Sequence, residues 1–289
     1  IFKDVDVSKF IKNGENVFIY DSKKSYEASE FSNNLRKKNN IQVKDLNRKD
    51  IHDLEPNLAP VYYAGHLLLG SRHTTNPLKI SKKIFESFLN GGGKFINENV
   101  KNLDANQNLI ELNLQEKKIK FDKVVVCAGA WSKSLAKMAG DDFPLDTERG
   151  YHVLFNTDKQ LINRPIGWTR SGFYLVQMED GIRAAGTVEI AGLDKPLNQK
   201  IINMIEIQAR KILPQLGPVK SSWMGRRPTL PDAKPIIGKS QKNKNVMYAF
   251  GHQHIGWTLA AVTGKIINDL AKETQPNIDI SPFSPDRFI

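Results

Sequence analysis

Apolar and polar positions repeat with two different periods along this chain of 289 residues, and each period predicts a type of element. Residues 15–20 (ENVFIY) predict a strand, and residues 24–38 have the spacing of a helix with a polar face. Prolines punctuate residues 54–60 (LEPNLAP), which predicts a turn. Residues 77–90 predict an amphipathic helix, because Pro77 stands in its first turn and apolar residues share one side.

In the middle of the chain, helical and strand patterns follow one another. The apolar side of the predicted helix is formed by Leu78, Ile84, Phe85, Phe88 and Leu89. Three glycines at 91–93 predict its end, and a strand over 94–104 and a hairpin over 109–121 are expected next. Residues 123–127 (KVVVC) contain a short continuous apolar run, as in a strand covered on both faces, and a helix follows. This order favours a parallel nucleotide-binding sheet carrying a β-excursion.

The second half of the chain predicts antiparallel structure first and α/β structure after it. Residues 148–190 contain strands with aromatic residues, separated by turn glycines, which is typical of an antiparallel sheet. The later segments predict a helix, a Pro-rich loop, a strand, a turn and a helix, in that order, over 197–212, 226–238, 245–250, 251–256 and 257–272. Because the two sheet types alternate along the chain, two interleaved domains are expected.

Charge and composition narrow the classes of function. The formal net charge is +11, which suggests nucleic-acid binding as a hypothesis. The lysines are scattered, however, and no basic run is interleaved with aromatic residues, so no nucleic-acid partner is expected. No stretch approaches the ~18 uncharged apolar residues of a membrane helix, so no transmembrane segment is expected.

The single cysteine and the first residues carry further expectations. Cys127 excludes an internal disulfide and a cysteine-based zinc cluster, and its apolar surroundings favour a buried, inert thiol. The first ten residues have neither a signal-peptide pattern nor a Met, so we expect the natural N-terminus to lie upstream.

Residues 124–132 (VVVCAGAWS) form the first candidate ligand site. They predict a strand, a turn and a helix, and Ala128 and Gly129 keep the turn free of bulk. The amide groups at the start of the helix then point toward a phosphate or a flavin edge. A plain tight connection between strand and helix is the alternative.

Residues 251–258 (GHQHIGWT) form the second candidate. Trp257 stands where a phosphate loop needs Lys, which excludes that motif. His252 and His254 are two residues apart, so a two-histidine metal site is not expected. The helix that starts at Gly256 is suited to the pyrimidine end of a flavin, where negative charge develops on reduction. The alternative is that both histidines cap the turn.

Two further motifs carry polar side chains. In residues 223–238 (WMGRRPTLPDAKPIIG), three prolines stiffen the segment and two arginines precede them, so a rigidly held Arg is able to grip a carboxylate. Tyr174 offers a hydroxyl at the end of an apolar strand. The alternatives are a surface arginine pair and a tyrosine at the rim of the core.

Together, these motifs resemble the D-amino-acid oxidase/dehydrogenase superfamily of FAD-dependent enzymes, and most of all the bacterial D-amino-acid dehydrogenases. The resemblance covers residues 13–289 and rests on the order of ERGYH (148–152), YLV to GTVE (174–189), WMGRRPTLPD to PIIG (223–238) and GHQHIGWT (251–258). VVVCAGAWS and LEPNLAP are also similar.

The resemblance implies a fold and a set of site residues. The fold is α/β (α+β), with a Rossmann-like FAD-binding domain (77–142 and 221–289) interleaved with an antiparallel-sheet substrate domain (1–76 and 143–220). The implied substrate-binding residues are Arg227, which holds the carboxylate, and Tyr174, His254, Tyr151 and His152. The implied FAD-binding residues are Val100, Ala128, Gly129, Trp131, Gly251, His252, Gln253, Ile255, Gly256, Trp257 and Thr258.

One departure concerns the start of the family pattern. Relatives open with a βαβ unit carrying GxGxxG, and this sequence has no GxGxxG. We therefore expect an N-terminally truncated chain that lacks this unit and binds FAD weakly or not at all by itself.

The resemblance implies oxidation of a D-amino acid, or of a related amine carboxylate such as hydroxyproline, by hydride transfer from Cα to flavin N5. The alternatives are an oxidase or demethylase of N-methylated or cyclic amino acids, such as sarcosine, and a non-catalytic fragment that docks with a flavoprotein. The implied partners are the amino acid and an electron acceptor (quinone, carrier or oxygen). The expected location is cytoplasmic, either free or peripheral on the inner membrane.

Overall fold

The computed structural model describes residues 5–105 and 109–288, which divide into two compact units. We refer to them as the first unit (Ile1–Gly93, Gly150–Val188 and Pro196–Gly225) and the second unit (Lys94–Arg149, Glu189–Lys195 and Arg226–Ile289). The chain therefore passes several times between the units, as the alternation of sheet types predicts. The assignment of FAD and substrate to particular domain ranges stays a prediction.

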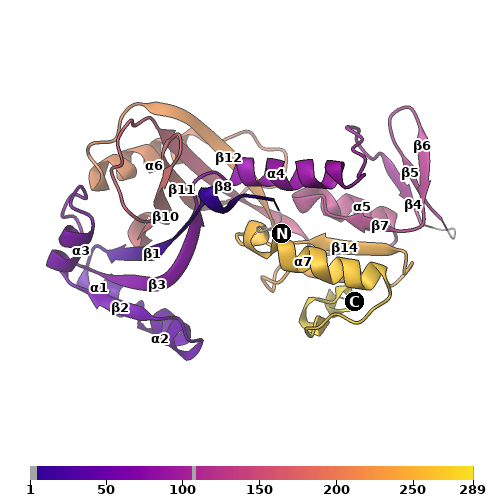
Figure 1. Ribbon diagram of the computed structural model, residues 1–289, viewed down its shortest axis with the longest axis horizontal. Helices are drawn as coiled ribbons and strands as arrows, with labels where there is room; N and C mark the ends of the chain where they lie inside the picture. The colour runs from indigo at the N-terminus through magenta and orange to yellow at the C-terminus, as the bar shows by residue number, and fades with distance from the viewer. Residues whose placement is uncertain (1–4, 106–108, 289) are drawn as a thin grey trace. The chain divides into compact units, whose positions relative to one another are not determined.

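An eight-stranded sheet, which runs through the first unit, has the strand order β12-β8-β11-β10-β9-β1-β3-β2 (Figure 1). Its strands are β1 Ile11–Tyr20, β2 Val43–Leu46, β3 Ala64–Thr74, β8 Asp146–Phe155, β9 Ile166–Trp168, β10 Phe173–Met178, β11 Gly181–Ile190 and β12 Val219–Thr229. Strand β10 pairs antiparallel with both β9 and β11, whereas β1 pairs parallel with β9. The predicted antiparallel sheet over 148–190 is confirmed.

Strand alternation gives this sheet two different faces. One face packs on α6 (Gln199–Ile212) and α3 (Arg48–Leu54), and it buries side chains such as Phe173 and Leu175 of β10. Tyr174, between them, is 41% exposed, because successive strand residues point to opposite sides. We call the side that carries Tyr174 the open face. It is the candidate ligand face of the first unit.

The predicted helix over 24–38 is two helices, α1 (Lys23–Glu27) and α2 (Glu30–Lys38). The break falls at Ser29, whose hydroxyl donates to the carbonyl oxygen of Tyr26 at 2.6 Å and lies 3.0 Å from Nε2 of His66. Local side-chain bonds of this kind compete with helical hydrogen bonding, which explains the interruption.

Helix α4 (Pro77–Asn90) has the predicted bounds, and Asn76 caps its start by accepting from the Lys79 amide at 3.0 Å. Ile80 is buried with Val7 and Phe10. The predicted apolar side is exposed in this structure, namely Leu78, Ile84, Phe85, Phe88 and Leu89.

The second unit contains two small sheets, with orders β4-β5-β6 and β13-β14-β7. Its elements are β4 Asn102–Asp104, β5 Ile110–Asn113, β6 Lys118–Phe121, β7 Val124–Val126, α5 Ser132–Met138, β13 Ile236–Lys239, β14 Val246–Phe250 and α7 Gly256–Ala271, with short 3₁₀ segments at Gly129–Trp131, Ser281–Phe283 and Pro285–Phe288. Strands β7 and β14 are parallel, which confirms the prediction of parallel pairing after the hairpin. Helix α7 packs on β13 and β14, and Figure 1 shows it beside β14.

Three local predictions are wrong. The strand expected over 94–104 is formed only at 102–104, and Phe95 and Ile96 of the irregular stretch before it are exposed instead of packed on a sheet. The Pro-rich loop expected over 226–238 is shorter, because β12 continues to Thr229 and β13 starts at Ile236. Cys127 is exposed, since strand β7 ends one residue before it.

Among the described residues, none of the helices has the length and apolar character needed to cross a membrane.

Candidate functional site

The turn after β7 leaves room for a ligand beside the backbone. Gly129 has φ +55°, and a Cβ atom built on it would meet no heavy atom of the described residues within 4 Å. Trp131, at the end of the 3₁₀ turn, is 53% exposed. Ala128 and Gly129 therefore offer bare backbone next to an exposed indole, which fits the close approach of a flat cofactor.

The turn between β14 and α7 is fixed by its backbone. Gly251 has φ +84°, and a Cβ there would lie 2.6 Å from Cδ1 of Leu230. Gln253 also has a positive φ of 49°, and its amide donates to the carbonyl oxygen of Pro228 at 3.1 Å. These constraints tie the predicted segment 251–256 to the end of β12 in the second unit.

The two histidines of this turn have different environments. His252 Nε2 lies 3.0 Å from the Thr263 hydroxyl of α7, and burial lowers the pKa of its imidazole. His254 is exposed, and its Nε2 lies 3.3 Å from Oε2 of Glu148. His252 therefore supports the helix, while His254 is accessible to a ligand. Within residues 5–105 and 109–288, no group of three or more His, Cys, Asp or Glu side chains is arranged to hold a metal ion.

Helix α7 begins in a way that suits an electron-rich ligand. Its N-cap residue, Ile255, makes no side-chain cap, and the first turn holds no acidic residue. The positive end of the dipole of this 16-residue helix is thus not countered by its own side chains. A Cβ at Gly256 would lie 3.0 Å from Cβ of His252, so the entry to the helix has little space for a larger residue.

The adjacent arginines of β12 have separate surroundings. Arg226 donates from Nε to the carbonyl oxygen of Leu193 at 2.5 Å, and its guanidinium lies 5.6 Å from the Trp131 ring centroid. Arg227 is half-buried, and burial lowers the pKa of its guanidinium although Glu148 opposes the shift. Arg226 binds a carbonyl oxygen of the second unit, and the half-buried Arg227 stays the candidate carboxylate-binding residue that the GRRP segment predicts.

Arg149, of the ERGYH motif, is a fully buried residue that the sequence did not single out. Its Nε donates to the carbonyl oxygen of Gly192 at 2.9 Å, and its NH1 lies 3.4 Å from Oε2 of Glu189. Arg149 and Arg226 therefore both hold the segment 189–195 within the second unit. The ERGYH motif is the sequence feature from which Arg149 could have been identified.

Tyr174 contacts Phe18 on the open face. Gly167 of β9 lies between them, in register with Phe18 of β1 and Tyr174 of β10. A Cβ at Gly167 would lie 3.0 Å from ring atoms of both residues, and the two rings meet edge to face at 5.6 Å. The glycine thus makes space for the ring of Tyr174.

His152 and Tyr151 cannot both face a ligand, because they are neighbours on β8. His152 stacks on Trp223 with 5.4 Å between ring centroids, and burial together with nearby Arg183 lowers its pKa to about 4. Tyr151 is buried in the core of the first unit, and its hydroxyl accepts from the Asn198 amide at 3.3 Å. His152 therefore stays a candidate pocket residue, whereas Tyr151 is a core residue.

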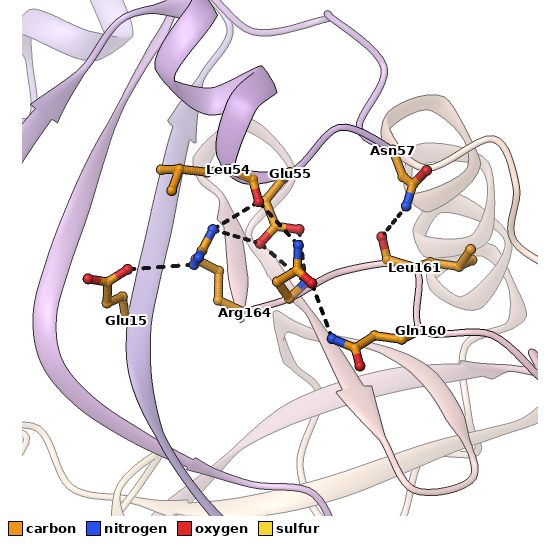
Figure 2. A network of polar contacts seen from close by, with 8 residues as sticks. Glu15, Leu54, Glu55, Asn57, Gln160, Leu161 and Arg164 are labelled. Atoms are coloured by element: carbon orange, nitrogen blue, oxygen red, sulfur yellow. Dashed lines mark hydrogen bonds and ion pairs between the residues drawn. The ribbon is translucent and has the colours of Figure 1, made fainter.

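The LEPNLAP turn binds the residues that lead into β9 (Figure 2). Glu55, 1% exposed, accepts from the Asn163 amide at 2.9 Å and from NH1 of Arg164 at 3.1 Å. Arg164 also donates to the carbonyl oxygen of Leu54 at 3.0 Å, and its Nε lies 3.7 Å from Oε2 of Glu15. This network fixes the residues that lead into β9.

The implied residues fall into two groups, one in each unit. The first unit holds Tyr174, His152 and Tyr151. Val100 lies half-buried in the irregular stretch before β4. It belongs to the second unit with Ala128, Gly129, Trp131, Arg227, Gly251, His252, Gln253, His254, Ile255, Gly256, Trp257 and Thr258.

Residues 11–270 match the family model described as DAO, FAD dependent oxidoreductase. A D-amino-acid oxidase from Bradyrhizobium diazoefficiens is 33% identical over 261 residues, covering 88% of this chain and 62% of that protein. A D-amino acid dehydrogenase from Vibrio atlanticus is 33% identical over 178 residues, covering 59% of this chain and 42% of that protein.

Solved structures agree on the fold. The crystal structure of glycine oxidase from Geobacillus kaustophilus superimposes with a TM-score of 0.89 at 18% identity, over 97% of this chain and 76% of that one. The chain thus spans less than two thirds of the length of these two curated relatives.

Proposed function

Because the chain belongs to the DAO family of FAD-dependent oxidoreductases, we propose that the protein it forms oxidises a D-amino acid to the imine. The imine is then hydrolysed to a 2-oxo acid and ammonia. The observation that carries the proposal is Arg227, a half-buried arginine in the GRRP segment, where burial lowers the pKa of the guanidinium. A desolvated guanidinium is well suited to bind the carboxylate common to all amino acids.

The second unit has features that fit FAD. Gly129 gives open space beside the backbone, and Trp131 presents an exposed ring next to it. The uncapped start of α7 meets the turn 251–255. We propose that Gly129 and Trp131 lie along the cofactor. The turn 251–255 and the start of α7 then surround the flavin ring. When bound, FAD supplies a hydride acceptor at N5.

The residues of the chain then have to bind, orient and desolvate the substrate. Arg227 holds the carboxylate in a fork, which fixes the direction of the Cα–H bond. The start of α7 stabilises negative charge on an adjacent ring. Tyr174 and His152 give the open face of the first unit an aromatic and a polar side chain. His152 is neutral at pH 7, because its pKa is about 4, so it contributes a polar surface without charge.

Replacement of Arg227 by alanine tests this assignment in the FAD-loaded protein that contains the chain. We expect KM for amino acids to rise by about 10–100-fold, since one charge-assisted contact is worth roughly 1.5–3 kcal/mol. Arg72→Ala, which removes an exposed cation from β3, serves as the charge-matched control. Equal KM values for Arg227→Ala and the parent protein would overturn the role of Arg227.

A dye-reduction screen defines the substrate class. We expect reduction with D-amino acids and not with their L-enantiomers. Glycine, sarcosine and the hydroxyproline isomers belong in the same screen, because activity confined to these would favour the related N-methyl or cyclic amino acid oxidases. Replacing the dye by oxygen or a quinone then identifies the electron acceptor.

A further inference from the structure

A surface cavity lies in the first unit, where β1 begins and β3 ends. Its volume is about 690 Å³, which is within the range of small-molecule sites. The lining residues come mainly from β1, β3, β10 and the segment before β9, and all of them belong to the first unit. The residues assigned above to FAD and to the amino acid do not line it, so the proposed function makes no use of this cavity.

A β-bulge opens the backbone beside the cavity. The register of β1 with β3 shifts between Gly14 and Asn16, so that Leu69 and Gly70 stand opposite the single residue Glu15. Gly14 and Gly70 both line the cavity. A Cβ atom built on either glycine would meet no heavy atom of the described residues within 4 Å, and Gly70 has a φ of +69°. Bare backbone is therefore accessible to a ligand on both strands.

Lys12 and His73 place two basic side chains on the wall of the cavity, and we call them the basic pair. They stand directly opposite one another in the antiparallel pairing of β1 with β3, so they lie on the same face. Burial lowers the pKa of the His73 imidazole, and the charge of Lys12 lowers this pKa further. Among the described residues, neither side chain has a hydrogen-bond or ion-pair partner.

The acidic groups around the cavity, by contrast, are bound to other residues. Oε2 of Glu15 lies 3.7 Å from Nε of Arg164, which also donates from NH1 to the buried Glu55 at 3.1 Å (Figure 2). Glu179, just after β10, accepts from Lys79 at 2.7 Å. These carboxylates therefore have cationic partners of their own, and the basic pair has none, which favours an anionic ligand.

We propose that this cavity binds the phosphate group of a small polar molecule through the basic pair. A phosphate monoester carries about −1.5 to −2 charges at pH 7 and offers acceptor oxygens to both side chains. Lysine presents a compact charge instead of a planar fork, so it suits a phosphate better than a bidentate carboxylate. The imidazole supplies an N–H donor, and an adjacent dianion favours its charged form.

The size of the cavity indicates that the phosphate belongs to a larger molecule. A volume of about 690 Å³ exceeds what a phosphate ion fills, and Asn13 and Gln160 add polar side chains to the lining. Hydroxyl groups of a ligand are able to bind such amides. The inference does not depend on the proposed function, because neither FAD nor an amino acid takes part in it.

Calorimetric titration of the FAD-loaded protein that contains the chain tests the choice of phosphate. We expect glucose 6-phosphate and inorganic phosphate to bind and glucose not to bind. Glucuronate, which carries a carboxylate in place of the phosphate ester, should bind at least about fivefold more weakly than glucose 6-phosphate. Absence of binding by both phosphates, or equal affinity for glucose 6-phosphate and glucuronate, would overturn the proposal.

Variants of the basic pair test the location. Lys12→Met and His73→Gln should each weaken the affinity for glucose 6-phosphate by about fivefold, as expected for partly exposed charged contacts. Arg72→Met removes an equal charge from an exposed neighbour on β3 that does not line the cavity, and it should leave the affinity unchanged. Equal weakening by Arg72→Met and Lys12→Met would show attraction to the overall positive charge and no specific site.

An NMR titration of His73, identified by the signal that His73→Gln loses, gives a readout in the parent protein. The midpoint should rise when inorganic phosphate is added, because a nearby anion favours the imidazolium, and chloride at equal ionic strength should have no such effect. Lys12→Met should raise the midpoint without phosphate, since it removes a like charge. A midpoint that saturating phosphate leaves unchanged would refute the proposal even if a variant failed to fold.

Discussion

Adjacent residues of strand β8 show how strongly environment decides the role of a side chain. Tyr151 and His152 stand side by side in the ERGYH motif, yet one is packed in the core and the other stacks on Trp223. The pKa of His152 falls to about 4 because burial and nearby Arg183 disfavour the imidazolium. A residue that is ionised near neutral pH in water is therefore neutral here.

This shift predicts a pH dependence of stability. Since the folded pKa of about 4 lies below the ordinary value of 6.5, the unfolded chain binds more protons between these values. The stability contribution of His152 is fully present above pH 6.5 and is lost as the pH falls toward 4. Urea unfolding at pH 7 and pH 5 should show a smaller difference for His152→Gln than for the parent protein. An NMR titration midpoint near 6.5 for His152 would contradict the assignment.

At the scale of elements, the connection between β14 and α7 depends on backbone conformations that few residues adopt. Gly251 has a positive φ and a close neighbour in Leu230, whereas Gly264 lies within α7 with open space around it. Gly251 therefore has no room for a side chain and a backbone conformation that few residues adopt. Gly264, on the exposed surface of α7, has room for a Cβ atom.

Alanine at these two positions should have opposite effects. Gly251→Ala is expected to destabilise the protein by about 1–3 kcal/mol, because an L-residue is strained at this φ and its Cβ meets Leu230. Gly264→Ala should be neutral or stabilising by up to about 1 kcal/mol, because alanine is the better helix former. Thermal unfolding measures both. Equal destabilisation would show that the turn is not specifically constrained.

At the scale of the whole molecule, hydrogen bonds and ion pairs join segments that are distant in the sequence. The Glu55–Arg164 pair joins residues 109 apart within the first unit, and the carboxylate is almost fully buried (Figure 2). Burial raises the pKa of Glu55, while the Asn163 amide and Arg164 act in the other direction. The bonds around Glu55 hold the LEPNLAP turn to the entrance of β9.

A double-mutant cycle tests this tie. Glu55→Gln and Arg164→Met are each expected to destabilise the protein by about 1–3 kcal/mol, because each leaves a polar partner unsatisfied. The double variant should lose less than the sum, which gives a measurable coupling free energy in urea unfolding. Additive losses would mean that the two side chains act independently. Lys23→Ala, in an exposed ion pair with Glu27, is the control and should change little.

The sequence predicted those elements whose signal is local. The helix over 77–90 has both predicted bounds, because Pro77 and the glycines at 91–93 mark its ends in the residues themselves. The predicted strand over 94–104 was wrong, since a strand needs a partner that no local pattern reveals. Likewise, the buried Nε of Arg183 has no hydrogen-bond partner among the described residues, and only the structure shows this.

By itself, the sequence determined the family, the order of the elements and the motifs from which the candidate residues come, because these depend on short-range spacing and on residue type. The tertiary structure decided which of those residues are available. It placed Tyr151 in the core and His152 on the open face, it bound Arg226 to the carbonyl oxygen of Leu193, and it half-buried Arg227. Burial and partners are properties of packing between distant segments, which a sequence pattern does not contain.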